Sequence, residues 1–343
     1  TTTLLLTIAV AAAPQTDVFT VGTAAATRGH TARGTIEVPA GVDAALSIPV
    51  AVVHGAPGPV LAIVAGSHGT EYASIIAVER LIQQLDAKTI TGTVILVPLV
   101  NIPSFEQKIA HVNPVDGKSM NRFYPGKAEG TQTERASLAL TREVVEKADH
   151  LIDLHGGDLD ESLRPYSYWT KTGNDRQDGI SREMLLAFGL DTIIISADRP
   201  KDPAASRYLE NTASTRGKPS FAAEAGYAGT VETEDVNALV NGCIGVMHYL
   251  KMVNTGPKPI ESPVWIERVA SITSDVNGIF YPLVKRGTYV QKGQRVGYVT
   301  DYLGTTTQEA RAPESGVVLF IRAVPSMTKS ETIANIGVPS TSK

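Results

Sequence analysis

Two continuous apolar runs, far apart in the chain, end in the same way and constrain the fold more than any other feature. The run Val60–Gly66 leads into His68-Gly69-Thr70-Glu71, and a later run that begins at Leu151 ends in Asp153-Leu154-His155-Gly156. Continuous apolar runs are typical of strands that are covered on both faces of a sheet. If the two strands are neighbours in one open α/β sheet, both histidines lie outside the carboxyl ends of the strands, where such sheets place their sites.

The spacing of these polar residues indicates a metal site. His68 and Glu71 are three residues apart, so on the first turn of a helix their side chains share a face. With His155 they form a set of two histidines and one carboxylate, which is the ligand set of hydrolytic zinc with a fourth position left for water. Each motif alone is a weak signal, because a histidine at a strand end is more often structural. Their coincidence favours one Zn²⁺ per chain.

Two further motifs accompany the histidines. They are Asn121-Arg122-Phe123-Tyr124-Pro125-Gly126 and Ala223-Glu224-Ala225-Gly226, the latter at the end of a third apolar stretch. With HGTE, NRFYPG, DLHG and EAG in that order, the chain resembles the succinylglutamate desuccinylase/aspartoacylase family from about residue 34 to the C-terminus. These proteins are zinc amidohydrolases related to the zinc carboxypeptidases.

The resemblance implies roles for six side chains: Zn²⁺ ligation by His68, Glu71 and His155, substrate binding by Asn121 and Arg122, and catalysis by Glu224. The chain also departs from the family pattern. Tyr124 stands where the family usually has phenylalanine, and the arginine that many members carry shortly before the Asn-Arg pair is missing. The nearest basic side chains there are His111 and Lys118, so that part of substrate binding is not assigned.

The chemistry of amide hydrolysis requires the same kinds of groups, independently of the family resemblance. Zinc lowers the pKa of bound water from about 15.7 to roughly 7 and polarises the carbonyl. A carboxylate must take the water proton and return it to the leaving amine, and Glu224 is the candidate. Arg122 would stabilise the oxyanion or fork onto a substrate carboxylate, and Asn121 adds a donor. The structural alternatives are that Glu224 caps a loop, that Arg122 forms a surface ion pair and that Asn121 is a turn residue.

Several polar and aromatic residues near the second histidine remain open. Asp153 lies on the same strand face as His155, where it either orients a ligand or Arg122 or bonds to backbone amides. The acidic run Asp158, Asp160 and Glu161 is predicted to be a solvated loop without chemistry. Specificity is expected to reside in loops 158–169 and 201–216. Candidate pocket residues in the first of these are Arg164, Tyr166, Tyr168 and Trp169.

The alternation of patterns predicts an α/β fold with a mostly parallel or mixed sheet sandwiched by helices, and the family resemblance implies that this sheet is zinc-carboxypeptidase-like. The expected strands are Leu61–Ala65, Val94–Val100, Leu151–Leu154, Thr192–Ser196 and Phe221–Glu224, and the expected helices are Glu71–Leu85, Thr133–Lys147 and Val236–Leu250. Thr131 and Glu134 are expected to form a capping box at the start of the second helix.

The chain of 343 residues is too long for most single cores. We expect an N-terminal segment over 1–33, a catalytic domain over 34–254 and, after the Pro/Gly linker at Asn254–Pro259, a small all-β domain over 255–343. The last resembles the barrel-sandwich of lipoyl and biotinyl carriers. Its stretch Thr300–Arg311 has no lysine to modify, so a structural or site-covering role is predicted. Tyr281 and Tyr298 are the candidates in this domain for contact with a substrate.

Location and partners are predicted from the termini and the charge. The stretch Leu4–Ala13 resembles the end of a secretory signal peptide, which predicts a periplasmic or secreted protein, with a first strand in a cytoplasmic protein as the alternative. The net charge of −4 gives no electrostatic reason to expect nucleic acid. No stretch is long enough to span a membrane. The oligomeric state is open, with a homo-oligomer among the expectations.

The sequence therefore predicts a Zn²⁺-dependent amidohydrolase that removes an N-acyl group from an amino acid or similar small amine. A carboxypeptidase-type metallopeptidase acting on short peptides or cell-wall fragments would use the same metal and base. A protein that keeps the fold and binds zinc or ligand without catalysis is the remaining alternative.

Overall fold

The structure is a computed structural model, which describes residues 17–196 and 199–340. The segment Leu4–Ala13, on which the prediction of a signal peptide rests, lies outside the described residues. No helix in the described ranges is both long and apolar enough to cross a membrane.

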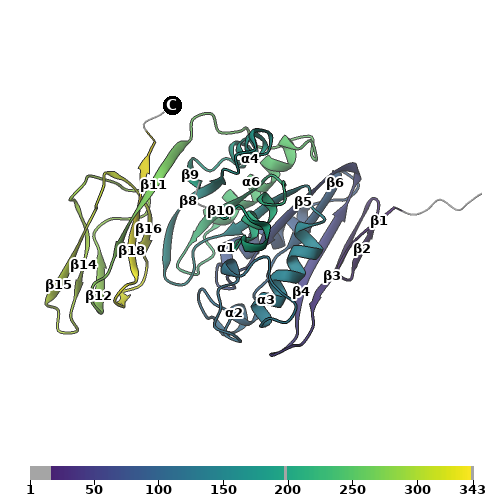
Figure 1. The fold of residues 1–343 in the computed structure, drawn as a ribbon. Helices are drawn as coiled ribbons and strands as arrows, with labels where there is room; N and C mark the ends of the chain where they lie inside the picture. Colours follow the sequence, from purple (N-terminus) through teal and green to yellow (C-terminus); the bar gives the residue numbers. More distant parts are fainter. Residues whose placement is uncertain (1–16, 197–198, 341–343) are drawn as a thin grey trace, which may run out of the picture.

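One mixed sheet of twelve strands runs through the molecule in the order β13-β16-β18-β11-β9-β8-β10-β7-β5-β6-β4-β3 (Figure 1). Its N-terminal part, which with the helices forms the α/β layers, comprises β3 (His30–Val38), β4 (Leu46–His54), β5 (Ala56–Ala65), β6 (Thr91–Val97), β7 (His150–His155), β8 (Glu161–Thr170), β9 (Thr192–Ser196) and β10 (Ser220–Tyr227). The neighbours β6, β5, β7 and β10 are parallel. These central strands are the continuous apolar runs of the sequence, as expected for strands that helices cover on both faces.

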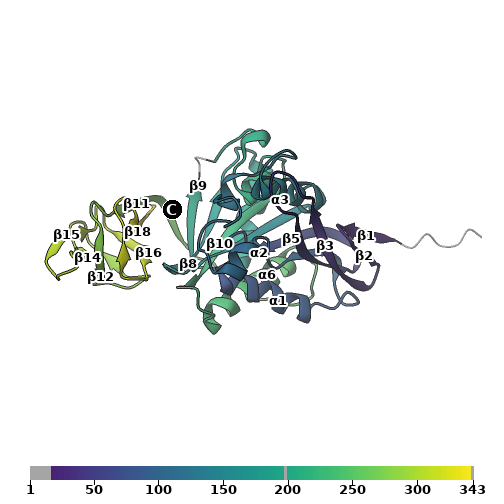
Figure 2. The same ribbon diagram turned by 90° about the horizontal axis from the view of Figure 1, so that it is seen from below.

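Helices cover the two faces of this sheet, as Figure 2 shows with α3 on one side and α1 and α6 on the other. The first face is covered by α1 (Tyr72–Gln84), α4 (Asp175–Phe188) and α6 (Thr233–Tyr249). The second is covered by α3 (Gln132–Leu140) and α5 (Leu209–Ser214), together with the hairpin of β1 (Val18–Val21) and β2 (Ala24–Thr27). The predicted fold class is confirmed, and its two apolar cores lie on opposite faces of the sheet.

The predicted helices are present with shifted ends. The second ends as an α-helix at Leu140 and continues as a π-helical turn over Thr141–Val145. The predicted capping box is present, because the Glu134 carboxylate accepts the Thr131 backbone N–H at 3.0 Å. The short helix α2 (Ile102–Gln107) and the 3-10 turn η1 (Met120–Arg122) lie between β6 and α3.

The C-terminal part is all-β. It comprises β11 (Val264–Thr273), β12 (Gly278–Pro282), β13 (Tyr289–Val290), β14 (Arg295–Thr300), β15 (Thr306–Arg311), β16 (Gly316–Arg322), β17 (Ser326–Met327) and β18 (Thr332–Pro339). A second sheet, β15-β14-β12-β17, packs on the end of the long sheet around its own apolar core. Strand β11 pairs with β9, and β16 pairs with β8. The β domain, which lies at the left in Figure 1, is therefore joined to the α/β part through a continuous sheet.

Candidate metal centre and active site

Three adjacent parallel strands bring the motifs of the sequence to one edge of the sheet. In the register, Ala65 at the end of β5 lies opposite Leu154 of β7. His155, at the end of β7, lies opposite Glu224 of β10. The carboxyl ends of the strands therefore coincide, and the expectation that the two histidine-bearing strands are neighbours is correct.

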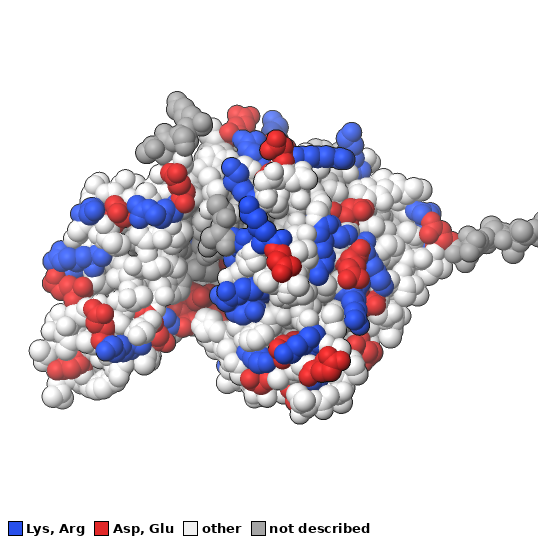
Figure 3. All heavy atoms as spheres, viewed as in Figure 1, with Lys and Arg blue, Asp and Glu red and all other residues white. Residues whose placement is uncertain are grey.

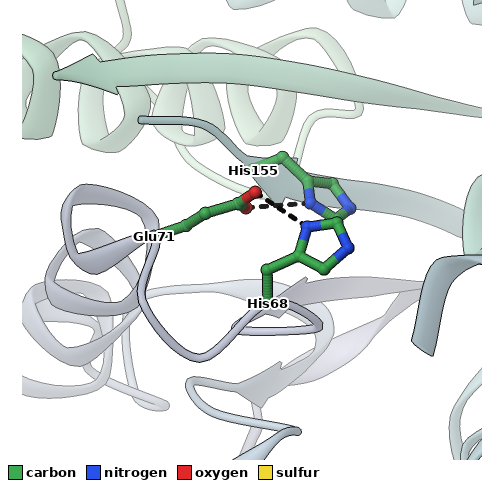
Figure 4. A group of neighbouring side chains, drawn as sticks. All are labelled: His68, Glu71 and His155. Atoms are coloured by element: carbon green, nitrogen blue, oxygen red, sulfur yellow. Dashed lines mark hydrogen bonds and ion pairs between the residues drawn. The ribbon is translucent and has the colours of Figure 1, made fainter. Parts of the chain in front are cut away.

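The two histidines converge on the carboxylate of Glu71 (Figure 4). Nδ1 of His68 lies 2.8 Å from Oε1, and Nδ1 of His155 lies 2.9 Å from Oε2. The three ligand atoms lie within 4.8 Å of one another. The side chains are 15%, 5% and 3% exposed for His68, Glu71 and His155. Two imidazole nitrogens and a carboxylate that meet in a largely buried position fit a tetrahedral zinc ion.

Glu71 reaches this position from a turn and not, as predicted, from the first turn of a helix. The segment from His68 to Glu71 is closed by a hydrogen bond from the Glu71 N–H to the His68 carbonyl, 3.3 Å long, and α1 begins at Tyr72. The Glu71 side chain does not cap the helix. It instead accepts the Gly156 N–H at 2.9 Å, in addition to facing the histidines. The three-residue spacing still brings the two ligands together, because a turn of this kind also places residues i and i+3 side by side.

The position after His155 requires a glycine, because the surrounding backbone leaves no room for a side chain there. The φ of Gly156 is +117°, and a Cβ would lie 2.4 Å from the backbone nitrogen of Ala225. The start of the loop after β7 therefore packs backbone against backbone on strand β10, which fixes the position of His155 relative to Glu224.

Polar side chains hold the far nitrogen of each histidine. Oδ1 of Asp153 lies 3.0 Å from Nε2 of His155, and Oγ of Ser119 lies 3.2 Å from Nε2 of His68. Asp153 is fully buried, and neither of its oxygens has a hydrogen bond of regular geometry among the described residues. Of its two predicted alternatives, the structure therefore favours orientation of a ligand over bonding to backbone amides. An imidazole that uses Nδ1 for a metal carries its proton on Nε2, which this carboxylate can accept.

Asn121 and Arg122 lie on η1, beside the histidines. The Asn121 amide oxygen accepts the Leu209 N–H at 3.1 Å, and its nitrogen lies 2.8 Å from Nε2 of His155. Arg122 is exposed, with its guanidinium 4.9 Å from the centre of the Tyr208 ring. A second guanidinium, that of Arg199, lies 3.9 Å from the centre of the same ring.

Arg199 was not a candidate in the sequence, where it lies far from every motif. Its Nε lies 3.2 Å from Oε1 of Glu210, which is almost fully buried. Two guanidiniums, those of Arg122 and Arg199, therefore lie against the Tyr208 ring and line the cavity.

Glu224 faces the same cavity from β10. Burial raises the pKa of its carboxyl group well above the usual range, and the nearby carboxylates of Glu71 and Glu161 add to the shift. Tyr166 lies directly opposite Glu224 in the register, and Tyr168 lies opposite Ala222. A carboxyl group with a raised pKa binds a proton more readily than an exposed glutamate does, which suits a general base that must also act as an acid.

A cavity of about 900 Å³ encloses these groups. It lies at the junction of the α/β part and the β domain, where Figure 3 shows a hollow in the surface beside the lobe at the left. The β domain contributes the lining residues Glu267, Arg268, Val269, Phe320 and Asn335.

The expected specificity loop 158–169 is mostly the strand β8. Tyr166 and Tyr168 line the cavity as predicted, whereas Arg164 is paired with Asp191 at 2.7 Å, outside the lining. Trp169 also lies outside it and packs on Trp265 with ring centres 5.5 Å apart. The expected loop 201–216 contains α5 and the 3-10 turn Pro203–Ala205.

Two further expectations were wrong. Tyr281 and Tyr298 stack on each other in the second sheet, with ring centres 5.0 Å apart, and neither lines the cavity. The acidic run is not a solvated loop, because Asp158 is fully buried and accepts hydrogen bonds from the Thr70 hydroxyl and the His111 backbone N–H. A run of acids in a sequence does not reveal that another part of the chain covers it.

Comparisons with known proteins identify the family of the chain. Residues 57–250 match the model of the succinylglutamate desuccinylase/aspartoacylase catalytic domain. The N-alpha-acetyl-L-2,4-diaminobutyric acid deacetylase of Halomonas elongata is 28% identical over 298 residues, which cover 85% of this chain and 86% of that protein.

Solved structures share the fold. The product-bound ectoine utilization protein EutE (DoeB) of Ruegeria pomeroyi superposes with a TM-score of 0.81 at 22% identity, covering 90% of this chain and 95% of that one. A succinylglutamate desuccinylase of Silicibacter sp. TM1040 gives a TM-score of 0.82 at 21% identity, covering 96% of this chain and 100% of that one.

Proposed function

Because the chain belongs to the succinylglutamate desuccinylase/aspartoacylase family of amidohydrolases, we propose that it is a zinc-dependent deacylase that hydrolyses an N-acyl amino acid. The observation that carries the proposal is the convergence of two Nδ1 atoms on Glu71 in the cavity that also holds Glu224. The relative from Halomonas elongata, a deacetylase of an acetylated diamino acid by its name, suggests a small acyl group and an amino acid of similar size.

His68, Glu71 and His155 would hold the zinc ion, with Asp153 and Ser119 keeping the two rings in orientation. The ion would supply a water of lowered pKa and polarise the acyl carbonyl. Glu224 takes the proton of the attacking water and returns it to the nitrogen of the leaving amine. Its raised pKa lets one carboxyl group serve both steps.

Arg122 and Arg199 would bind the substrate carboxylate from the Tyr208 side of the cavity. A guanidinium offers two parallel N–H donors to a carboxylate, which fixes orientation as well as position. Asn121 lies between this region and His155 and holds the backbone of Leu209. It thereby keeps the substrate side of the cavity in register with the ligands.

The test is amine release by the zinc-loaded protein from N-acetyl, N-succinyl and longer N-acyl amino acids and from short peptides, with a chelated sample as control. Chelator-sensitive cleavage of acyl amino acids supports the proposal. Release of only C-terminal residues from peptides would instead assign the protein to carboxypeptidase-type chemistry. Zinc binding without turnover on any substrate would favour a binding protein.

We also propose that the protein acts outside the cytoplasm, on the basis of the apolar segment Leu4–Ala13. Fractionation of cells that express the full gene product tests this location, and recovery in the cytoplasmic fraction with the segment intact would contradict it.

A further inference from the structure

Strand β8 contains an irregularity that turns Glu161 toward the reaction cavity. In the pairing with β10, Tyr166 lies opposite Glu224 and Leu163 lies opposite Gly226. Between these two pairs, β8 advances by three residues while β10 advances by two. The extra residue reverses the alternation of side chains along the strand. Glu161 and Leu163 therefore line the same cavity as Tyr166, although a regular strand would have placed Glu161 and Tyr166 on opposite faces.

Other charged groups near Glu161 already have partners. Asp158 faces Nδ1 of His111 at 3.2 Å, and Asp160 faces Nε2 of His111 at 2.9 Å. Asp160 also pairs with Arg322, which comes from the β domain. A hydrogen bond with the Asp160 carboxylate raises the pKa of His111 to about 9, so this ring is an imidazolium at neutral pH. The two aspartates thus form a neutralised cluster with His111 and Arg322.

Glu161 lacks such a partner. Its Oε2 accepts the Asp158 N–H at 3.2 Å, whereas Oε1 has no hydrogen bond or ion pair with any residue in the ranges 17–196 and 199–340. The ring of His111 is near, within 4.8 Å, but is engaged by both aspartates. Burial raises the pKa of Glu161 to about 8, and the charge of Glu71 adds to the shift. A carboxylate in this environment is stabilised by any cation that enters the cavity.

We propose that Glu161 is a specificity-determining residue that binds a free ammonium group on the substrate, so that the preferred substrate is an N-acyl amino acid with a second, unacylated amine. This inference rests on the proposed deacylase function and names the residue that selects among its substrates. The cavity offers the matching polarity, with the guanidiniums of Arg122 and Arg199 near Tyr208 and the carboxylate of Glu161 at the start of β8.

The first test compares two substrates that differ only in the amine, Nα-acetyl-2,4-diaminobutyrate and Nα-acetyl-2-aminobutyrate, on the zinc-loaded protein. We expect kcat/KM to favour the amine-bearing substrate by roughly 10-fold to 100-fold, the range for one charge-assisted hydrogen bond. The variant Glu161→Gln should reduce this ratio to near one, mainly through a higher KM for the amine-bearing substrate. Its amide oxygen can still accept the Asp158 N–H, so the fold is retained. Glu183→Gln, exposed on α4, is the matched control and should keep the ratio.

A second readout does not depend on turnover. Calorimetric titration of the zinc-loaded protein with the two deacylated amino acids should show tighter binding of 2,4-diaminobutyrate, and Glu161→Gln should abolish the difference. Equal kcat/KM values or equal affinities in the unmutated protein would overturn the proposal while leaving the deacylase function intact. A failure to hydrolyse any acyl amino acid would refute the deacylase function, and the titration would still decide the role of Glu161. Binding of two zinc ions per chain, with one lost in Glu161→Gln, would also overturn the proposal, because the carboxylate would then serve a second metal.

Discussion

Replacement of Asp153 by asparagine is expected to weaken zinc binding without removing a ligand. The carboxylate is fully buried, and its Oδ1 lies 3.0 Å from Nε2 of His155, the nitrogen opposite the one that faces Glu71. An asparagine keeps the shape of the side chain but removes the negative charge that holds the ring proton on Nε2. The ring would then lose both its fixed orientation and part of its basicity at Nδ1.

Loss of a partner of this kind typically costs about 10-fold to 100-fold in metal affinity, which corresponds to roughly 1.4–2.8 kcal/mol of binding free energy. The estimate applies in full because no solvent can substitute for a carboxylate at this depth. At a fixed excess of zinc, the stabilisation of the folded state by the metal should fall by the same amount, since that stabilisation grows with the logarithm of the ratio of ligand concentration to Kd.

A competition titration against a chromophoric chelator measures the affinity directly and is independent of changes in the stability of the metal-free protein. Asp191→Asn is the control, because the Asp191 side chain is exposed and, among the described residues, pairs only with Arg164 and Thr192. Zinc affinities of Asp153→Asn and the unmutated protein that agree within twofold would refute the role given to Asp153, even if the variant were inactive.

Three further predictions follow from single contacts. Gly156→Ala should lower the free energy of unfolding by about 2–4 kcal/mol in urea titrations, because a Cβ would lie 2.4 Å from the Ala225 nitrogen at a φ of +117°; a smaller loss would mean that the loop after β7 can move away from β10. His111→Gln should cost about 1 kcal/mol at pH 6, a value discounted because the side chain is 45% exposed. Since the hydrogen bond with Asp160 raises the folded-state pKa to about 9, this contribution is complete below the unfolded-state pKa of about 6.5 and is lost as the pH rises through about 9, so titrations at pH 10 should show no difference. Arg322→Met should lower the melting temperature through a loss of about 1–3 kcal/mol, because it removes the partner of Asp160 between the β domain and the α/β part; an unchanged melting temperature would show that this pair does not hold the β domain in place.

The ligands could be predicted from the sequence because local patterns specify them. An apolar run identifies the strand, its end identifies the edge of the sheet, and a histidine lies at that end or within three residues of it. The same reasoning located Glu224, since β10 ends its apolar run at that residue. Each of these predictions uses only a few consecutive residues.

The rest of the site depends on contacts between distant segments. Ser119 meets His68 across 51 positions, and Arg199 enters the cavity through a segment without a motif. The bulge in β8 reverses the direction of Glu161, and only its pairing with β10 reveals this. The burial of Asp158 could not be predicted either, because the residues that cover it, Thr70 and His111, are distant in the sequence.

The central claim, that a zinc ion held by His68, Glu71 and His155 works with Glu224 to hydrolyse an acyl amide, is tested most directly by one paired measurement. Zinc content and turnover of an N-acyl amino acid are determined for the unmutated protein and for Glu224→Gln. The account predicts one zinc ion per chain in both proteins, with kcat lowered by about 10²-fold to 10⁴-fold in the variant. Turnover in Glu224→Gln within a few-fold of the unmutated protein, or activity that survives complete removal of zinc, would contradict it.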